Sequence, residues 1–119
     1  MRILKVHARI SLGEKPPITI FPSAAEKEEI TRNKTLYRQA MAETAAQFWP
    51  DADRIVVDTE WEYDVRDWWY ICLIDKYGEE IEALVLPKST EMAVYKRFVD
   101  STYKRKLSEI GDDGSRGWG

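Results

Sequence analysis

The chain has 119 residues, of which 44% are hydrophobic and 33% are charged, and it carries a net charge of −3. These values predict one globular domain rather than a disordered chain. No apolar run is as long as the roughly 18 residues that a membrane span needs, so we expect a protein that does not bind a membrane. The single cysteine, Cys72, excludes an internal disulfide, and we therefore expect a cytoplasmic protein.

Charge is distributed unevenly along the chain. Residues 51–82 contain eleven acids against three basic residues, whereas residues 1–15 and 88–110 are each basic by three charges. Such asymmetry affects the choice of partner more than the fold, and the acidic middle segment predicts a partner with a basic surface.

The first predicted elements are a strand, a turn and a helix. Apolar side chains occupy every second position of "ILKVHARISL" (residues 3–12) from Leu4 onward, the pattern of a half-buried strand. Residues 13–17 predict a turn, and residues 18–21 a short second strand that pairs back. Ser23 and Glu26 have the spacing of a capping box, which predicts a helix from Ser23 to Pro50, with a break in the polar segment 31–35 as an alternative.

From Arg54 the hydrophobic period changes from that of a helix to that of a strand. Trp61 and Tyr63 are expected to point inward, and the outward face is an acidic row: Asp58, Glu60, Glu62 and Asp64. Residues 64–67 predict a hairpin turn, residues 68–74 a central strand, residues 75–80 a second turn and residues 81–86 a third strand.

A second helix begins at Ser89 or Thr90. Its apolar stripe runs from Met92 through Tyr95 to Ile110, and Gly111 is the expected C-cap. The elements predict an α+β fold of order β(β)–α–β–β–β–α, in which two helices pack on an antiparallel sheet made of an N-terminal strand or hairpin plus a three-stranded meander. We expect residues 1–110 to form a single domain and residues 111–119 to be a flexible C-terminal tail.

Two tryptophans follow the acidic row. Because Trp68 and Trp69 are adjacent in a strand, one ring is expected in the core and the other beside the carboxylates. An exposed tryptophan ringed by carboxylates is typical of a protein-binding hot spot, so the predicted contact residues are Asp58, Glu60, Glu62, Asp64, Trp68 and Trp69. The alternatives are a solvated face neutralised by Lys5 and Arg9, and a divalent-metal site held by the carboxylates.

The second helix is basic, and nucleic-acid binding is therefore the alternative function. Its candidate phosphate contacts are Lys96, Arg97, Lys104, Arg105 and Lys106. The α–β–β–β–α order from Leu36 onward resembles that of double-stranded-RNA-binding domains in topology only, since "LPKSTEMAVYKR" has one lysine before the helix and an acid at its start.

The sequence gives little reason to expect an enzyme. One histidine and one cysteine cannot form a Cys/His zinc site, His7 lies in a predicted strand, and Cys72 has no electropositive neighbour in sequence to activate it. No glycine-rich phosphate-binding motif occurs. We therefore expect a non-enzymatic protein-binding domain of the inhibitor, immunity or adaptor type, without metal or cofactor.

Overall fold

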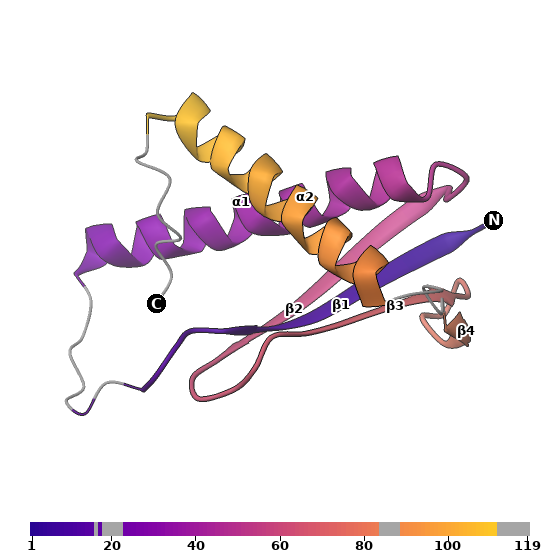
Figure 1. Ribbon diagram of the computed structural model, residues 1–119, viewed down its shortest axis with the longest axis horizontal. Helices are drawn as coiled ribbons and strands as arrows, with labels where there is room; N and C mark the ends of the chain where they lie inside the picture. Colours follow the sequence, from indigo (N-terminus) through magenta and orange to yellow (C-terminus); the bar gives the residue numbers. More distant parts are fainter. Residues whose placement is uncertain (16, 18–22, 84–88, 112–119) are drawn as a thin grey trace.

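The computed structural model describes residues 1–15, 17, 23–83 and 89–111. Two helices lie on one face of a four-stranded sheet, which confirms the expected α+β class (Figure 1). The elements in chain order are β1 (Ile3–Ser11), α1 (Ala24–Phe48), β2 (Arg54–Glu62), β3 (Trp68–Ile74), β4 (Glu80–Ala83) and α2 (Ser89–Glu109).

The sheet is mixed, and the prediction of an antiparallel sheet is wrong. Its strand order is β2-β1-β3-β4, with β1 parallel to β2 and antiparallel to β3, and with β3 antiparallel to β4. The connection from β1 to β2 contains the 25-residue helix α1, which carries the chain back along the sheet, as a parallel pair requires. The N-terminal strand thereby becomes a central strand.

The predicted hairpin at residues 64–67 is also wrong, because β2 and β3 lie on opposite sides of β1. The loop between them passes over the end of β1, where the Ser11 N–H donates to Asp67 Oδ1 at 2.7 Å and the Asp64 N–H donates to the Gly13 carbonyl at 2.9 Å. The three-stranded meander, and with it the topological resemblance to double-stranded-RNA-binding domains, is therefore not formed. The second turn is confirmed: β3 and β4 pair, and Gly78 in their turn has φ +86°.

Helix α1 begins where the sequence predicts. The Ser23 hydroxyl oxygen accepts a hydrogen bond from the Glu26 N–H at 3.2 Å and so caps the helix. The alternative of a break at residues 31–35 is excluded, since α1 is continuous from Ala24 to Phe48. The Thr35 hydroxyl donates to the Thr31 carbonyl at 3.0 Å, a bond made within the helix.

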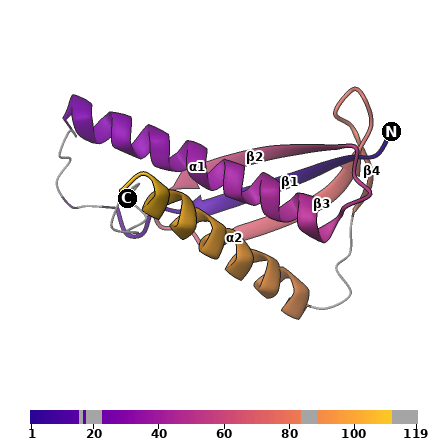
Figure 2. The same cartoon turned by 90° about the horizontal axis from the view of Figure 1, so that it is seen from above.

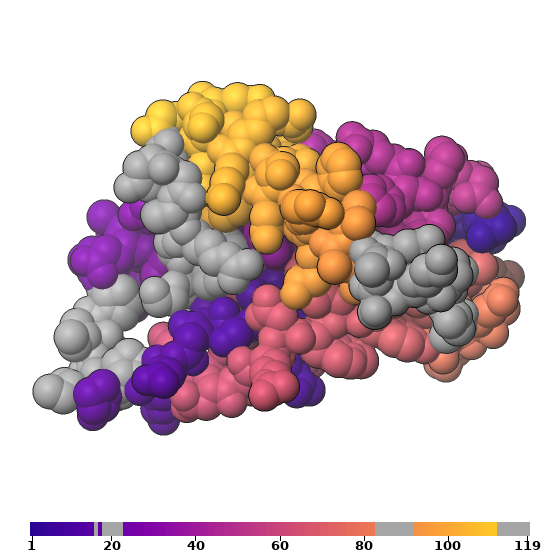
Figure 3. Space-filling model, viewed as in Figure 1, coloured from indigo at the N-terminus to yellow at the C-terminus, as the bar shows by residue number. Residues whose placement is uncertain are grey.

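The core lies between the sheet and the helices (Figure 2). In the space-filling view, atoms of α2 lie directly against atoms of the sheet below them (Figure 3). The alternate residues of β1 that face the helices are at most 1% exposed: Leu4, Val6, Ala8 and Ile10. The expected stripe of α2 is buried from Tyr95 to Leu107, but Ile110 at its end is 49% exposed, which corrects that prediction. Tyr37 of α1 meets the rings of Trp61, Trp69 and Tyr103 edge to face, and so joins both helices to the sheet.

Several predictions fall wholly or partly outside the described residues. They are the second strand at 18–21, the end of the third strand at 84–86 and all but the first residue of the tail at 111–119. Gly111 closes α2 with φ +82°, and its N–H donates to the Ser108 carbonyl at 3.1 Å.

Candidate functional site

The side of the sheet opposite the helices, here called the open face, carries most of the predicted protein-binding residues. Its side chains belong to three neighbouring strands: Lys5, His7 and Arg9 of β1, Val56, Asp58, Glu60 and Glu62 of β2, and Trp68, Tyr70, Cys72 and Ile74 of β3. Side chains alternate between the two faces along each strand. These side chains lie on the open face because their neighbours in sequence face the core.

The acidic row on β2 lies beside a mixed row on β1. In the β1–β2 register His7 is opposite Asp58 and Arg9 is opposite Glu60. His7 Nδ1 is 2.9 Å from Asp58 Oδ2, and Arg9 Nε is 3.7 Å from Glu60 Oε2 and 3.5 Å from Glu62 Oε2. Arg9 thus partly neutralises Glu60 and Glu62, but the acidic side chains on this face outnumber the lysine and arginine side chains.

The row ends sooner than predicted. Strand β2 stops at Glu62, and Asp64 has φ +58°, a left-handed conformation that breaks the strand alternation. Its carboxylate accepts from the Lys15 N–H at 3.2 Å. Tyr63, which we expected to point inward, is 39% exposed, so that prediction is wrong. Of the four acids, only Asp58, Glu60 and Glu62 lie together.

Trp68 and Trp69 lie on opposite faces of β3. The Trp68 ring is on the open face, 48% exposed, and is stacked on Tyr70 with 5.7 Å between ring centroids and 2° between ring planes. The Trp68 and His7 rings are arranged edge to face, with 5.5 Å between their centroids. Trp69 packs against the core, and its ring meets Tyr95 of α2 at 5.9 Å. The exposed ring is therefore that of Trp68. Because β1 lies between β3 and β2, His7 and Arg9 separate this ring from the acidic row, and the prediction of an exposed ring beside the carboxylates is wrong. Trp69 is partly buried and packs against the core.

A cavity of about 470 Å³ adjoins the Trp68 ring. It is lined by Arg9, Arg66, Asp67 and Trp68, and so combines two basic side chains, one acidic side chain and an aromatic ring. Arg9, Arg66, His7 and Tyr70 were not among the predicted site residues. The alternation of β1 places Arg9 and His7 on its polar face, but only the pairing of β1 between β2 and β3 brings them to Trp68 and Asp58.

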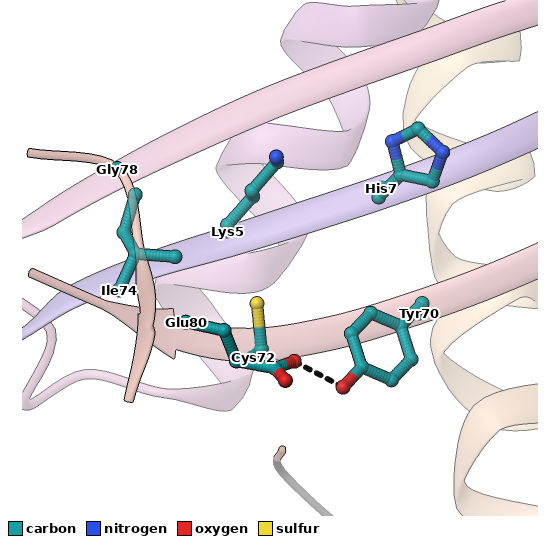
Figure 4. Close-up of a pocket in the computed structure, with 7 residues that line it drawn as sticks. All are labelled: Lys5, His7, Tyr70, Cys72, Ile74, Gly78 and Glu80. Atoms are coloured by element: carbon teal, nitrogen blue, oxygen red, sulfur yellow. Dashed lines mark hydrogen bonds between the residues drawn. The ribbon is translucent and has the colours of Figure 1, made fainter. Parts of the chain in front are cut away.

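A second cavity, of about 350 Å³, lies further along the open face (Figure 4). Lys5 and His7 enter it from β1, Tyr70 and Cys72 from β3, and the Glu80 carboxylate extends across Cys72 to accept a hydrogen bond from the Tyr70 hydroxyl. That bond, together with burial, raises the pKa of Tyr70 to about 12.

The Cys72 thiol in this cavity is poorly suited to nucleophilic chemistry. Burial raises its pKa above the ordinary value of 9.0, and the Glu80 carboxylate raises it further, so the thiol is protonated at neutral pH. Among the described residues no group of three or more His, Cys, Asp or Glu side chains could hold a metal ion. What the open face offers is an aromatic anchor, cations and carboxylates for non-covalent contacts.

The basic residues of α2 do not form one free patch. Lys106 Nζ is 2.8 Å and Arg105 Nη2 is 3.7 Å from the Glu43 carboxylate of α1. Lys96 Nζ is 3.9 Å from Asp67 Oδ2 and 5.6 Å from the centre of the Trp69 ring. Arg97 and Lys104 are exposed on the same helix. The predicted phosphate contacts are thus divided between intramolecular ion pairs and solvent.

Comparisons with protein-family models, with curated proteins and with solved structures find no match for this chain. Neither helix in the described part of the chain has the length and apolar character needed to cross a membrane.

Proposed function

We propose that this chain is a protein-binding domain, of the inhibitor, immunity or adaptor type, whose contact surface is the open face. The observation that carries the proposal is the position of Trp68, which is 48% exposed on the open face, stacked on Tyr70 and separated from the acidic row of β2 by His7 and Arg9 of β1. A tryptophan that is already held in place loses little conformational entropy on binding and buries a large area, as binding hot spots do.

The charge of the face indicates the kind of partner. Asp58, Glu60 and Glu62 lie in one row, and their side chains remain about half exposed, at 49 to 51%. A partner with lysine or arginine at the contact would gain charge-assisted hydrogen bonds and faster association at low salt. The cavity beside Trp68 is lined by Arg9 and Arg66, so it would accept an apolar or acidic side chain of such a partner and not a basic one.

The alternative proposal, nucleic-acid binding by α2, has less support. Lys96, Arg105 and Lys106 already have carboxylate partners within the molecule, and each phosphate contact would have to compete with these pairs. The acidic row would in addition repel a nucleic acid that approached the open face. A salt-dependent shift of duplex RNA that is lost on replacing Arg97 and Lys104 by alanine would favour this alternative.

The proposal is tested by capture of partners from an extract of the native host. We expect Trp68→Ala, and separately Asp58→Lys with Glu60→Lys, to weaken capture by about tenfold or more, because each removes a contact at the centre of the surface. Glu28→Lys with Glu29→Lys is the matched control, since it makes the same charge change on exposed residues of α1. It should capture like the wild type.

Circular dichroism and urea unfolding must show that all variants are folded. Capture that survives both open-face variants, or that the α1 control loses equally, would contradict the proposal, since the contact would then lie elsewhere or be a non-specific attraction to negative charge.

A further inference from the structure

Strand β2 is an edge of the sheet, and its outer side carries no strand among the described residues. It is nine residues long, so about 30 Å of backbone lies at this edge. None of its residues is fully buried, whereas alternate residues of the neighbouring strand β1 are. Strand β4, at the other edge, has four residues within the part of the chain that the structure describes. The long edge is therefore the place where the sheet could be extended.

The register tells which backbone groups of β2 point outward. The Leu12 N–H donates to the Glu62 carbonyl at 2.7 Å, and the Arg54 N–H donates to the Arg2 carbonyl at 3.3 Å, so even-numbered residues of β2 bond to the β1 side. Backbone groups alternate in direction along a strand. The N–H and C=O groups that point away from the sheet are thus those of Ile55, Val57, Thr59 and Trp61.

The side chains along this edge exclude one occupant and favour another. A second copy of the chain that paired through β2 would bring Asp58, Glu60 and Glu62 opposite the same acids, and like charges on neighbouring strands are destabilising. A strand with lysine or arginine at every second position would instead place a cation opposite each acid. Its remaining side chains would lie beside Val57 and Trp61, which are apolar and only partly buried.

We infer that the protein partner docks by adding an extended segment to the β2 edge, with basic and apolar residues in alternation. This rests on the proposed function and specifies its mode of recognition. The backbone of the added strand would bond to the outward groups of Val57 and Thr59, and its basic side chains would continue the open face next to the acidic row. The acids both prevent self-pairing and select the partner.

The test uses a synthetic nine-residue peptide in which lysine and valine alternate. The readout is amide hydrogen exchange of the full chain by NMR. With saturating peptide, exchange of the Val57 and Thr59 amides should slow by about tenfold or more, since these N–H groups become bonded. The Asp58 and Glu60 amides, which already bond to the β1 side, should change much less.

Two controls separate strand addition from attraction between charges. A peptide of the same composition with its lysines and valines in two blocks should bind at least about tenfold more weakly, because cross-strand pairing needs the alternation. Asp58→Lys with Glu60→Lys should lose the lysine–valine peptide and bind a glutamate–valine peptide in its place. That exchange of preference also shows that the variant is folded.

Three results would overturn the inference. Slow exchange of Val57 and Thr59 in the free protein at every concentration would mean that the chain itself covers the edge, and slow exchange only at high concentration would mean that a second copy does. Peptide binding that leaves both amides unprotected would place the contact on the open face and not at the edge. The capture experiment, which uses the intact partner, decides the proposed function separately.

Discussion

The Tyr95 hydroxyl is a polar group at the centre of the core. Tyr95 is 0% exposed, and its hydroxyl donates to the Met41 carbonyl of α1 at 2.8 Å. Its ring also meets Phe48, Trp49 and Trp69 edge to face. Burial raises the pKa of this hydroxyl far above the ordinary value of 10.0, because a phenolate inside the core would lose its hydration.

Replacing Tyr95 by phenylalanine should therefore have two effects. At neutral pH it removes one buried hydrogen bond and should lower the free energy of unfolding by about 1 kcal/mol. Above about pH 10 the unfolded chain loses the Tyr95 proton while the folded chain keeps it, so the wild type loses stability as pH rises. The variant lacks this group, and its stability should decline less steeply in urea titrations at pH 8 and pH 10.5.

The exposed Tyr77 provides the control for this prediction. It is 78% exposed, so Tyr77→Phe should leave the free energy of unfolding at neutral pH within about 0.5 kcal/mol of the wild-type value. An alkaline decline in Tyr95→Phe as steep as that of the wild type would show that other groups control the loss of stability.

At this scale the sequence predicts faces well. Alternation in β1 correctly assigns every buried residue from Leu4 to Ile10. It also predicts that Trp68 and Trp69 face opposite ways, but not which one is outward, because that depends on the partners of β3. The prediction for Tyr63 is wrong because the alternation in the sequence continues beyond Glu62, whereas the strand itself ends there. The positive φ of Asp64 then turns the chain out of the strand direction.

At the scale of elements, the connection between β2 and β3 decides the topology. It spans the end of β1, and Asp67 holds it there: its Oδ1 accepts from the Ser11 N–H at 2.7 Å, and its Oδ2 is 3.9 Å from Lys96 Nζ of α2. One side chain thus connects the loop, the central strand and the second helix.

Asp67→Ala should destabilise the fold by about 2 kcal/mol, because it leaves the partly buried Ser11 N–H without its charged acceptor. Urea unfolding monitored by tryptophan fluorescence measures the loss. Asp67→Asn is the matched variant, since an amide oxygen can still accept from Ser11, and it should lose less than about 1 kcal/mol. Equal losses in the two variants would assign the effect to the ion pair with Lys96 instead.

The element types were predictable from the sequence, but the neighbours of each strand were not. The Ser23–Glu26 spacing and the strand periods are local signals. They predict α1, β1, β2 and β3 within a few residues of their observed bounds. Pairing of β1 with both β2 and β3 is a contact between distant segments, and no local pattern distinguishes it from a hairpin at residues 64–67. The acidic row was predictable from the strand alternation alone, whereas the position of His7 and Arg9 beside it was not.

At the scale of the whole molecule, the two topologies place different residues opposite Cys72. In the structure Lys5 of β1 is its cross-strand partner. A hairpin closed by residues 64–67 would instead place Thr59 opposite Cys72, whereas Thr59 here pairs with Ala8, on the far side of β1 from β3. The native cysteine therefore permits a direct chemical test of which strand is central.

We predict that Lys5→Cys forms a disulfide with Cys72 on mild oxidation, because cross-strand partners lie within the range that a disulfide can bridge. The bond would close most of the chain into a loop and should stabilise the fold by about 4 kcal/mol, seen as a higher urea midpoint that a reductant reverses. Thr59→Cys should remain reduced under the same conditions. A disulfide in Thr59→Cys and none in Lys5→Cys would refute the mixed sheet, and with it the outer edge of β2 on which partner docking depends.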